Sequence, residues 1–274
     1  AGDDHNRSYA RHLATLNERS EWLDAQAMFE LTGSRHYRSG LFTPGTLMLQ
    51  PAGYIRGLAA GLRAAGVEVF EQSPVTGFER TGADWQVKTT QGQITTPRII
   101  LANNGHLESF GIAKGRLMQL FLYASMTPEL DADHLKALGG APRWGVTPSD
   151  PMGTTMRRTD SAQGGNRIIT RTCANLRPDM TASGADVARA ARVQRAKFDA
   201  RFPQLAEVKM QYEWAGHLCL TLNGVSVTGQ IEQGVFSACV QNGLGTARGT
   251  LTGIAAAELA MAQHSPIADH FAPE

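Results

Sequence analysis

The clearest periodic pattern of hydrophobic residues begins just after residue 50. Four apolar residues recur at steps of three and four, which places them on one helix face: Tyr54, Ile55, Leu58 and Leu62. With Pro51 in the first turn and Gly66 after the end, the pattern predicts an amphipathic helix over 51–65. The next four residues, Val67 to Phe70, predict a short buried strand.

Short apolar runs separated by turn residues follow. They predict a meander of three strands, over 75–80, 85–89 and 93–95, and then a buried strand over 98–102. This last run stops at Asn103, Asn104 and Gly105. Open α/β sheets bind ligands just past the carboxyl ends of their parallel strands, so this junction is a candidate site.

The chain between residues 116 and 213 has a different pattern. Strands are predicted over 117–126, 154–158 and 167–172, with the last two paired, and an amphipathic helix over 186–202 ends before Pro203. Antiparallel strands and one helix between parallel-sheet segments indicate a second, inserted domain.

In the first 50 residues, helices are expected over 8–17 and 22–31, with Asp24 as a cap for the second.

A strand, a glycine turn and a helix are predicted near the C-terminus. An apolar run over 235–240 leads through Gly243 and Gly245 into an alanine-rich helix that Thr246 can cap. The unpaired N–H groups of such a first turn favour an anionic ligand. The alternative is a plain strand-to-helix connection whose glycines serve packing only.

Composition narrows the functional classes. The 274 residues carry 26 basic and 25 acidic side chains without a run of Lys or Arg, which argues against nucleic acid and anionic membranes as partners. No apolar run is long enough to span a bilayer. The scattered histidines suggest no metal site, and Cys173, Cys219 and Cys239 suggest reduced thiols of a cytoplasmic protein.

Five segments occur in an order that resembles a known family. They are GLFTPGTLMLQPAGYIRGLA (40–59), SPVTGFER (73–80), WQVKTTQGQITTPRIILANNG (85–105), WAGHLCLTLNGVSVTG (214–229) and QNGLGTARGTLTGIAAAEL (241–259). Together they are similar to the FAD-dependent amine oxidoreductases of the glycine oxidase and D-amino-acid oxidase family, especially γ-glutamylputrescine oxidase-like members. The resemblance covers residues 33 to 262 and implies FAD as cofactor.

One part of the family pattern is missing. Family members begin with a strand, G-x-G-x-x-G, a helix and an acidic residue, which bind the FAD pyrophosphate and ribose. The only G-x-G here, Gly243 to Gly245, leads into a helix that no strand follows. The chain is therefore expected to lack the N-terminal βαβ unit and to bind FAD poorly.

The resemblance implies an α/β fold of mixed α+β character. An incomplete Rossmann-like FAD-binding domain (51–116 and 214–264) would carry an inserted antiparallel-sheet substrate domain (117–213), with 1–50 connecting or belonging to the latter.

The resemblance also implies which residues face the cofactor. The cofactor candidates are Val75, Ala102, Asn103, Gly105, Asn242, Gly243, Leu244, Gly245 and Thr246. A core position for Val75 and a plain strand–turn junction at 102–105 are the structural alternatives.

Four residues are substrate-binding candidates: Arg157, Arg158, Tyr123 and His217. Strand alternation lets only one of the two arginines face the site, where a guanidinium would suit a substrate carboxylate. Tyr123 and His217 have structural roles as the alternative. No catalytic side chain is assigned, because in the family the flavin itself accepts the hydride.

The implied function is oxidation of the C–N bond of a small-molecule amine or amino acid. The alternative is a catalytically silent fragment or subunit that binds a partner through an exposed sheet edge, as a homodimer or with a companion chain.

Overall fold

A computed structural model describes residues 2–271 and divides the chain into two compact units. Unit 1 consists of Ala1–Gln50, Phe121–Asn175 and Thr181–Gly216. Unit 2 consists of Pro51–Leu120, Leu176–Met180 and His217–Glu274. The functional domains expected from the sequence stay a prediction, since compactness alone does not show what a unit binds.

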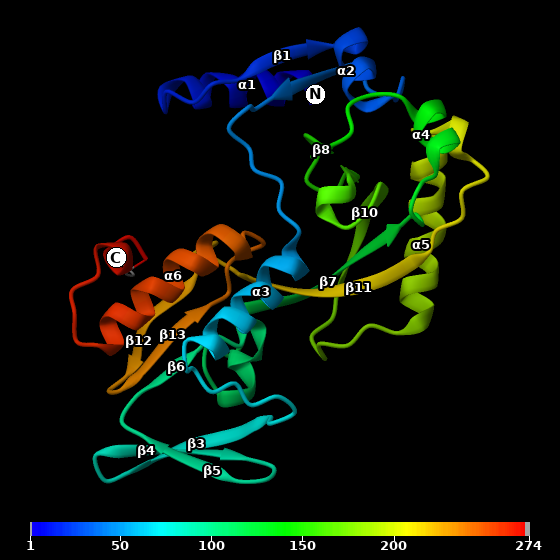
Figure 1. Ribbon diagram of the computed structural model, residues 1–274. Coiled ribbons are helices and arrows are strands. Elements are labelled where there is room, and N and C mark those ends of the chain that lie inside the picture. Colours follow the sequence, from blue (N-terminus) through cyan, green and yellow to red (C-terminus); the bar gives the residue numbers. More distant parts are fainter. Residues whose placement is uncertain (1, 272–274) are drawn as a thin grey trace. The chain divides into compact units, whose positions relative to one another are not determined.

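A five-stranded sheet forms the centre of unit 1, in the order β11-β7-β10-β9-β8 (Figure 1). Its strands are β7 (Leu117–Met126), β8 (Trp144–Val146), β9 (Thr155–Thr159), β10 (Arg167–Leu176) and β11 (Tyr212–Thr221). β7 and β11 extend into the segments of unit 2 at one end. The predicted pairing of β9 with β10 is confirmed, antiparallel with Arg167 opposite Thr159.

Helix α5 (Gly184–Asp199) covers one face of this sheet. Met156 and Ile168 from the strands and Phe198 from the helix lie in one buried apolar cluster. Alternate residues of β10, namely Ile168, Thr170 and Thr172, are buried, as expected for a strand covered on one side. In β9 the same face buries Met156 and Arg158, and Thr155 on the other face is buried as well.

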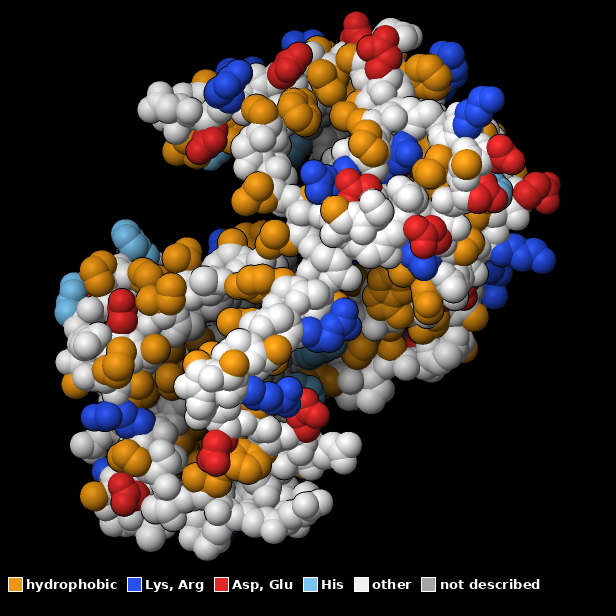
Figure 2. Space-filling model, viewed as in Figure 1, with side chains coloured by type: hydrophobic (Ala, Val, Ile, Leu, Met, Phe, Trp, Pro, Cys, Tyr) orange, Lys and Arg blue, Asp and Glu red, His pale blue; other side chains and the backbone are white. Residues whose placement is uncertain are grey.

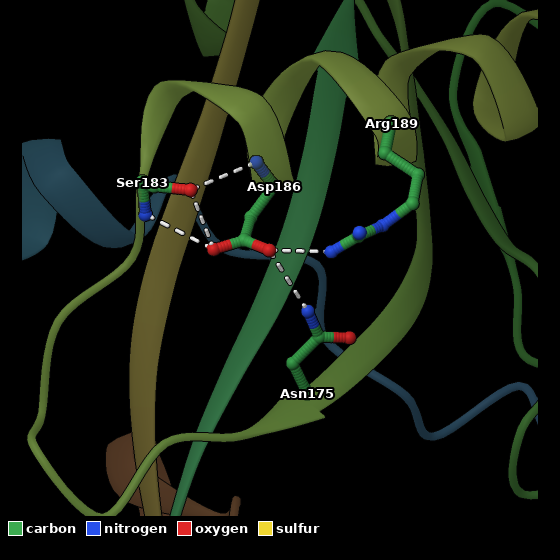
Figure 3. Close-up of polar contacts among 4 residues, drawn as sticks. All are labelled: Asn175, Ser183, Asp186 and Arg189. Atoms are coloured by element: carbon green, nitrogen blue, oxygen red, sulfur yellow. Dashed lines mark hydrogen bonds and ion pairs between the residues drawn. The ribbon is translucent and has the colours of Figure 1, made fainter.

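The start of α5 is set by a capping box (Figure 3). The Ser183 hydroxyl accepts a hydrogen bond from the Asp186 N–H at 3.1 Å, and the Asp186 carboxylate accepts one from the Ser183 N–H at 3.1 Å. Arg189 and Asn175 donate to the other oxygen of this carboxylate. Because the cap is Ser183, the helix begins two residues earlier than predicted, and it ends at Asp199, before Pro203.

The first 50 residues pack within unit 1. They form α1 (Gly2–Thr15), β1 (Glu21–Asp24), α2 (Ala25–Thr32) and β2 (Ser39–Phe42). Asp24 caps α2 as predicted, accepting a hydrogen bond from the Ala27 N–H at 2.9 Å. The helix predicted from residue 22 begins only at Ala25, because residues 21–24 pair with β2. α1 begins at Gly2, not at residue 8.

Unit 1 also holds several short elements. They are α4 (Ala132–Leu138) and the 3₁₀ helices η2 (Ser161–Gln163) and η3 (Pro203–Leu205).

Unit 2 contains two three-stranded sheets (Figure 1). The predicted meander is present as β3 (Val75–Thr81), β4 (Asp84–Thr89) and β5 (Gln93–Thr96). The other sheet has the order β12-β13-β6, from Val227–Glu232, Val235–Cys239 and Ile99–Leu101, with β13 and β6 parallel. Helix α6 (Gly245–Ala260) packs on it through Ala256 and Ala260 against Phe236. The remaining elements are η1 (Asn104–Phe110) and α7 (Pro266–Asp269).

The helix predicted after residue 50 forms, as α3 (Pro51–Ala64), but it has no buried residue. Its apolar residues are exposed, with Ile55 at 59% and Leu58 at 48%. Orange side chains are visible on the surface of the part that holds α3 and α6 (Figure 2).

The strand predicted over Val67 to Phe70 is wrong. Phe70 is 66% exposed, and these residues pair with no strand in the described part of the chain. Backbone N–H and C=O groups that lack a partner strand are left to hydrogen-bond with water, so these residues do not form a β-strand.

No helix within residues 2–271 combines the length and the apolar character needed to cross a membrane. The same residues contain no group of three His, Cys, Asp or Glu side chains that could hold a metal ion. All three cysteines are free thiols.

Candidate functional site

The ends of two parallel strands bring the predicted cofactor residues of unit 2 together. Because β6 and β13 are parallel, their carboxyl ends lie at the same edge of the sheet. The Cys239 thiol at the end of β13 lies 3.2 Å from the Leu101 carbonyl oxygen and 3.5 Å from Asn103 Oδ1. The segments 102–105 and 240–246 therefore start side by side.

The N-terminus of α6 offers unpaired N–H groups at this edge. Leu244 is its N-cap and supplies no side-chain hydrogen bond; Thr246 lies inside the first turn, so the predicted Thr246 cap is wrong. Gly243 has φ +83° and Asn242 has φ +52°, and both values belong to the left-handed region. A helix start without a side-chain cap can hold negative charge.

The side chain of Asn242 holds this turn in place. Its Oδ1 accepts hydrogen bonds from the Thr221 N–H at 2.8 Å and from the Thr221 hydroxyl at 3.2 Å. Leu218 on β11 lies beside the turn, because a Cβ on Gly243 would be 4.0 Å from its methyl group. Asn242 thus acts on the protein backbone, and Gly243, Leu244 and Gly245 form the exposed part of the turn.

An apolar cavity of about 520 Å³ lies next to the β6 end. It is lined by Val75, Phe78, Val87, Ile99, Ile100, Leu101, Ala102, Asn103, His106, Ser109 and Phe110. Val75 is 42% exposed and is not a core valine. The buried Asn103 Nδ2 has no hydrogen-bond partner in the described part of the chain.

The residues present fit one side of an FAD molecule. The cavity would accept a flat apolar ring, the unpartnered Asn103 amide would donate to it, and the α6 terminus would face negative charge. The residues that could hold the cofactor are therefore those at the two strand ends together with Val75.

Close packing explains why residue 105 is a glycine. A Cβ there would lie 2.3 Å from Gln119 Oε1 and 3.0 Å from the ring of His217. Gln119 donates to the Gly105 carbonyl at 3.1 Å and to Glu108 at 2.7 Å, and His217 bonds to Gln119 at 2.9 Å. Burial first, and then the charge of His106, lower the pKa of His217. His217 is thus part of a polar network within unit 2.

In unit 1 the two adjacent arginines have opposite environments. Arg158 is buried, its guanidinium donates to the Gly139 carbonyl, and burial lowers its pKa. Arg157 points to the other face, is exposed, and lines a cavity of about 730 Å³. Of these two arginines, only Arg157 is therefore available to a ligand.

Tyr123 does not lie with Arg157. Its side chain is 2% exposed and packs in the cluster that contains Ala190 of α5, on the covered side of the sheet. The buried Tyr123 hydroxyl has no hydrogen-bond partner among the described residues.

The cavity beside Arg157 contains residues that the sequence patterns did not single out. They include Tyr9, Phe42, Met48, Arg143 and Trp144. A further arginine, Arg171 on β10, lies on the same sheet face as Arg157. The alternation in RIITRTC (167–173) is the one sequence signal that could have placed Arg171 on that face.

Comparisons with known proteins agree with this geometry. The family described as FAD dependent oxidoreductase (DAO) matches residues 2–259. The chain is 27% identical to "Probable oxidoreductase OrdL" of Haemophilus influenzae over 225 residues, 81% of this chain and 49% of that protein. It is 27% identical to the γ-glutamylputrescine oxidoreductase of Escherichia coli over 264 residues, 91% of this chain and 59% of that protein.

Solved structures share the fold. Glycine oxidase from Geobacillus kaustophilus superposes with a TM-score of 0.79 at 17% identity, covering 96% of this chain and 68% of that one. L-proline dehydrogenase from P. horikoshii gives a TM-score of 0.75 at 16% identity, covering 97% and 72%. The chain spans about half to three fifths of the length of the curated relatives it matches. The family match over nearly the whole chain confirms the resemblance: the chain belongs to the DAO family of FAD dependent oxidoreductases.

Proposed function

We propose that this chain serves the FAD-dependent oxidation of the C–N bond of an amine or amino acid. The observation that carries the proposal is the convergence of 102–103 and the uncapped α6 terminus beside an apolar cavity. When bound there, FAD would accept the hydride from the carbon that bears the amine.

The residues of unit 2 would bind the cofactor and favour its negatively charged state. The first-turn N–H groups of α6 would stabilise an anion by about 0.3–2 kcal/mol through the helix dipole. Ala102 has only a methyl side chain, which lets a ligand approach the backbone, and Asn103 would donate its free amide hydrogen.

In unit 1, Arg157 would orient the substrate. An exposed guanidinium in a cavity suits a carboxylate, because it can donate to both oxygens. The name of the Escherichia coli relative refers to a γ-glutamyl amine, which supports an amine or amino acid as substrate.

The function is tested in the natural gene product. We expect it to retain FAD and its visible absorption to be bleached anaerobically by an amine or amino acid. A protein purified colourless that takes up no added FAD would contradict the proposal.

We further propose that the 274-residue chain alone binds FAD weakly, since it contains no G-x-G-x-x-G to hold the pyrophosphate. Titration of FAD into this chain, followed by flavin fluorescence, measures the affinity. Tight binding at one FAD per chain would show that the pyrophosphate loop is dispensable.

A second candidate function is that of a subunit that binds a companion chain or a second copy. The apolar face of α3 is exposed, Val67–Phe70 has no partner, and β6 pairs with β13 alone among the described strands. Open edges and apolar patches of this kind favour association.

Light scattering after size exclusion tests this candidate. We expect association that weakens in Leu58→Glu, on the apolar face of α3, and persists in Arg192→Gln, on the exposed side of α5. Two results together would exclude this function. The chain would stay monomeric at all concentrations, and it would form no complex when mixed with the N-terminal segments of its relatives.

A further inference from the structure

Two arginines of unit 1 lie side by side on the face of the sheet opposite α5. In the antiparallel pairing of β9 and β10, Arg157 is opposite Ile169 and Arg171 is opposite Thr155. Opposed residues share a face and alternate residues share a face, so Arg157 and Arg171 lie on the same one. Diagonal neighbours of this kind are roughly 7–8 Å apart at the backbone.

Neither positive charge is neutralised within the described residues. Arg171 donates a hydrogen bond to the Thr155 hydroxyl at 2.9 Å, and Arg157 donates none. Neither forms an ion pair with a carboxylate. Burial lowers the pKa of Arg171, and repulsion from the charge of Arg157 lowers it further. An anion between them would relieve this repulsion.

Among the described residues, none that lines the cavity in front of Arg157 has an acidic side chain. Its lining includes the aromatic residues Tyr9, Phe42 and Trp144, and the hydroxyls of Thr43, Thr46, Thr147 and Ser149. Arg143 also lines it, but this arginine has Asp160 at 3.8 Å. Asp150 lines an adjoining cavity, which shares Gly145, Thr147 and Ser149 with this one but does not include Arg157.

The backbone at Gly145 leaves room for the side chain of Arg157. Gly145 of β8 is opposite Arg157 in the sheet, and a Cβ on Gly145 would lie 3.7 Å from Arg157 Nη1. The arginine therefore extends across a position without a side chain. The neighbouring Arg171 is half-buried and is held by its hydrogen bond to the Thr155 hydroxyl.

We infer that Arg157 and Arg171 form a two-cation site for a ligand with two negative charges. If the proposed function holds, on which this step rests, the substrate is an amine that carries two carboxylates. Arg157 contacts one carboxylate in a fork, and Arg171 is a positioning residue that supplies the second positive charge. Unmodified polyamines are disfavoured, because their ammonium groups meet two unpaired guanidinium groups.

Calorimetric titration of the 274-residue chain without FAD tests the site. The probes are glutarate with two charges, butyrate with one and glutaramide with none. We expect glutarate to bind roughly tenfold or more tightly than butyrate, and glutaramide not to bind. Arg157→Gln should abolish glutarate binding, and Arg171→Gln should remove the preference for glutarate over butyrate.

Two further variants separate charge from folding. Arg171→Lys keeps the charge and should retain most of the glutarate preference, which a purely structural arginine would not explain. Arg192→Gln, an exposed arginine of α5 away from this cavity, should bind as the wild type does. Circular dichroism verifies that each variant is folded.

The inference is overturned if Arg171→Gln binds glutarate like the wild type, or if butyrate binds as tightly as glutarate. Glutarate binding that survives Arg157→Gln would place the anion elsewhere and would also overturn it. Because the titration uses no FAD, the two results are independent. Glutarate binding can be observed even if the proposed oxidation is wrong, and the oxidation can be correct even if glutarate does not bind.

Discussion

Arg157 and Arg158 show how much a single position in a strand decides. They are neighbours in the sequence, yet one guanidinium is buried against Gly139 and the other lines an open cavity. Alternation predicts that one of them faces a ligand. It does not say which, because that depends on the side of the sheet that α5 covers.

Gly105 carries a stability prediction at the residue scale. Gly105→Ala would push a methyl group against Gln119 and His217, and we expect a loss of about 1–3 kcal/mol in unfolding free energy. Urea denaturation measures it. Gly57→Ala is the matched control: Gly57 is in α3 with no atom near the new Cβ, so a gain of roughly 0.5–1 kcal/mol is expected. Equal effects at both sites would rule out the packing role of Gly105.

His217 carries a prediction about pH. Its pKa is below the ordinary 6.5 in the folded protein, because burial and His106 disfavour the charged ring. The unfolded chain therefore takes up this proton at higher pH, so stability is full above pH 6.5 and falls as the pH drops through the folded pKa.

Denaturation midpoints between about pH 7.5 and 5 measure this fall. His217→Gln should flatten it without removing it, since burial also lowers the pKa of His36. His12→Gln, an exposed position on α1, should keep the wild-type slope. A slope that is unchanged in His217→Gln would contradict the assignment.

At the scale of elements, the helices differ in what starts them. α5 has a complete capping box at Ser183 and Asp186, whereas α6 begins without a side-chain cap. Sequence patterns predict both helices, but a candidate cap residue forms its hydrogen bond only if the helix begins directly after it. Thr246 lies one residue past the start of α6 and cannot serve.

The two helix starts should respond differently to substitution. Ser183→Ala removes a capping hydrogen bond and should lower the unfolding free energy by about 1 kcal/mol. Thr246→Ala, in contrast, should change it by less than roughly 0.5 kcal/mol, because its hydroxyl caps nothing. Thermal or urea unfolding compares the two variants. A larger loss at Thr246 would mean that Thr246 is the N-cap and that α6 starts two residues later, at residue 247.

At the scale of the whole molecule, unit 2 shows that a hydrophobic pattern in the sequence does not ensure that the residues are buried. The period of α3 is amphipathic, yet its apolar face remains exposed, and Val67–Phe70 does not become a strand. A hydrophobic pattern reports what a segment can bury, whereas burial needs a partner surface. No surface among the described residues covers the apolar face of α3 or the Val67–Phe70 segment. These segments are therefore candidates for the interface that the light-scattering experiment tests.

The sequence by itself determined the elements whose signals are local. The amphipathic helices α3 and α5, the meander of β3 to β5, the β9–β10 pairing and the Asp24 cap follow from periodicity and turn chemistry. The family followed from the order of five segments and is confirmed.

Only the tertiary structure decided the rest, since those features depend on residues far apart in the chain. Long-range packing places Asn103 beside Cys239, directs Tyr123 under α5 and His217 against Gln119, and puts the exposed Arg157 and the half-buried Arg171 on one sheet face. A local pattern specifies which residues share a face; which face is covered is settled by what packs against it.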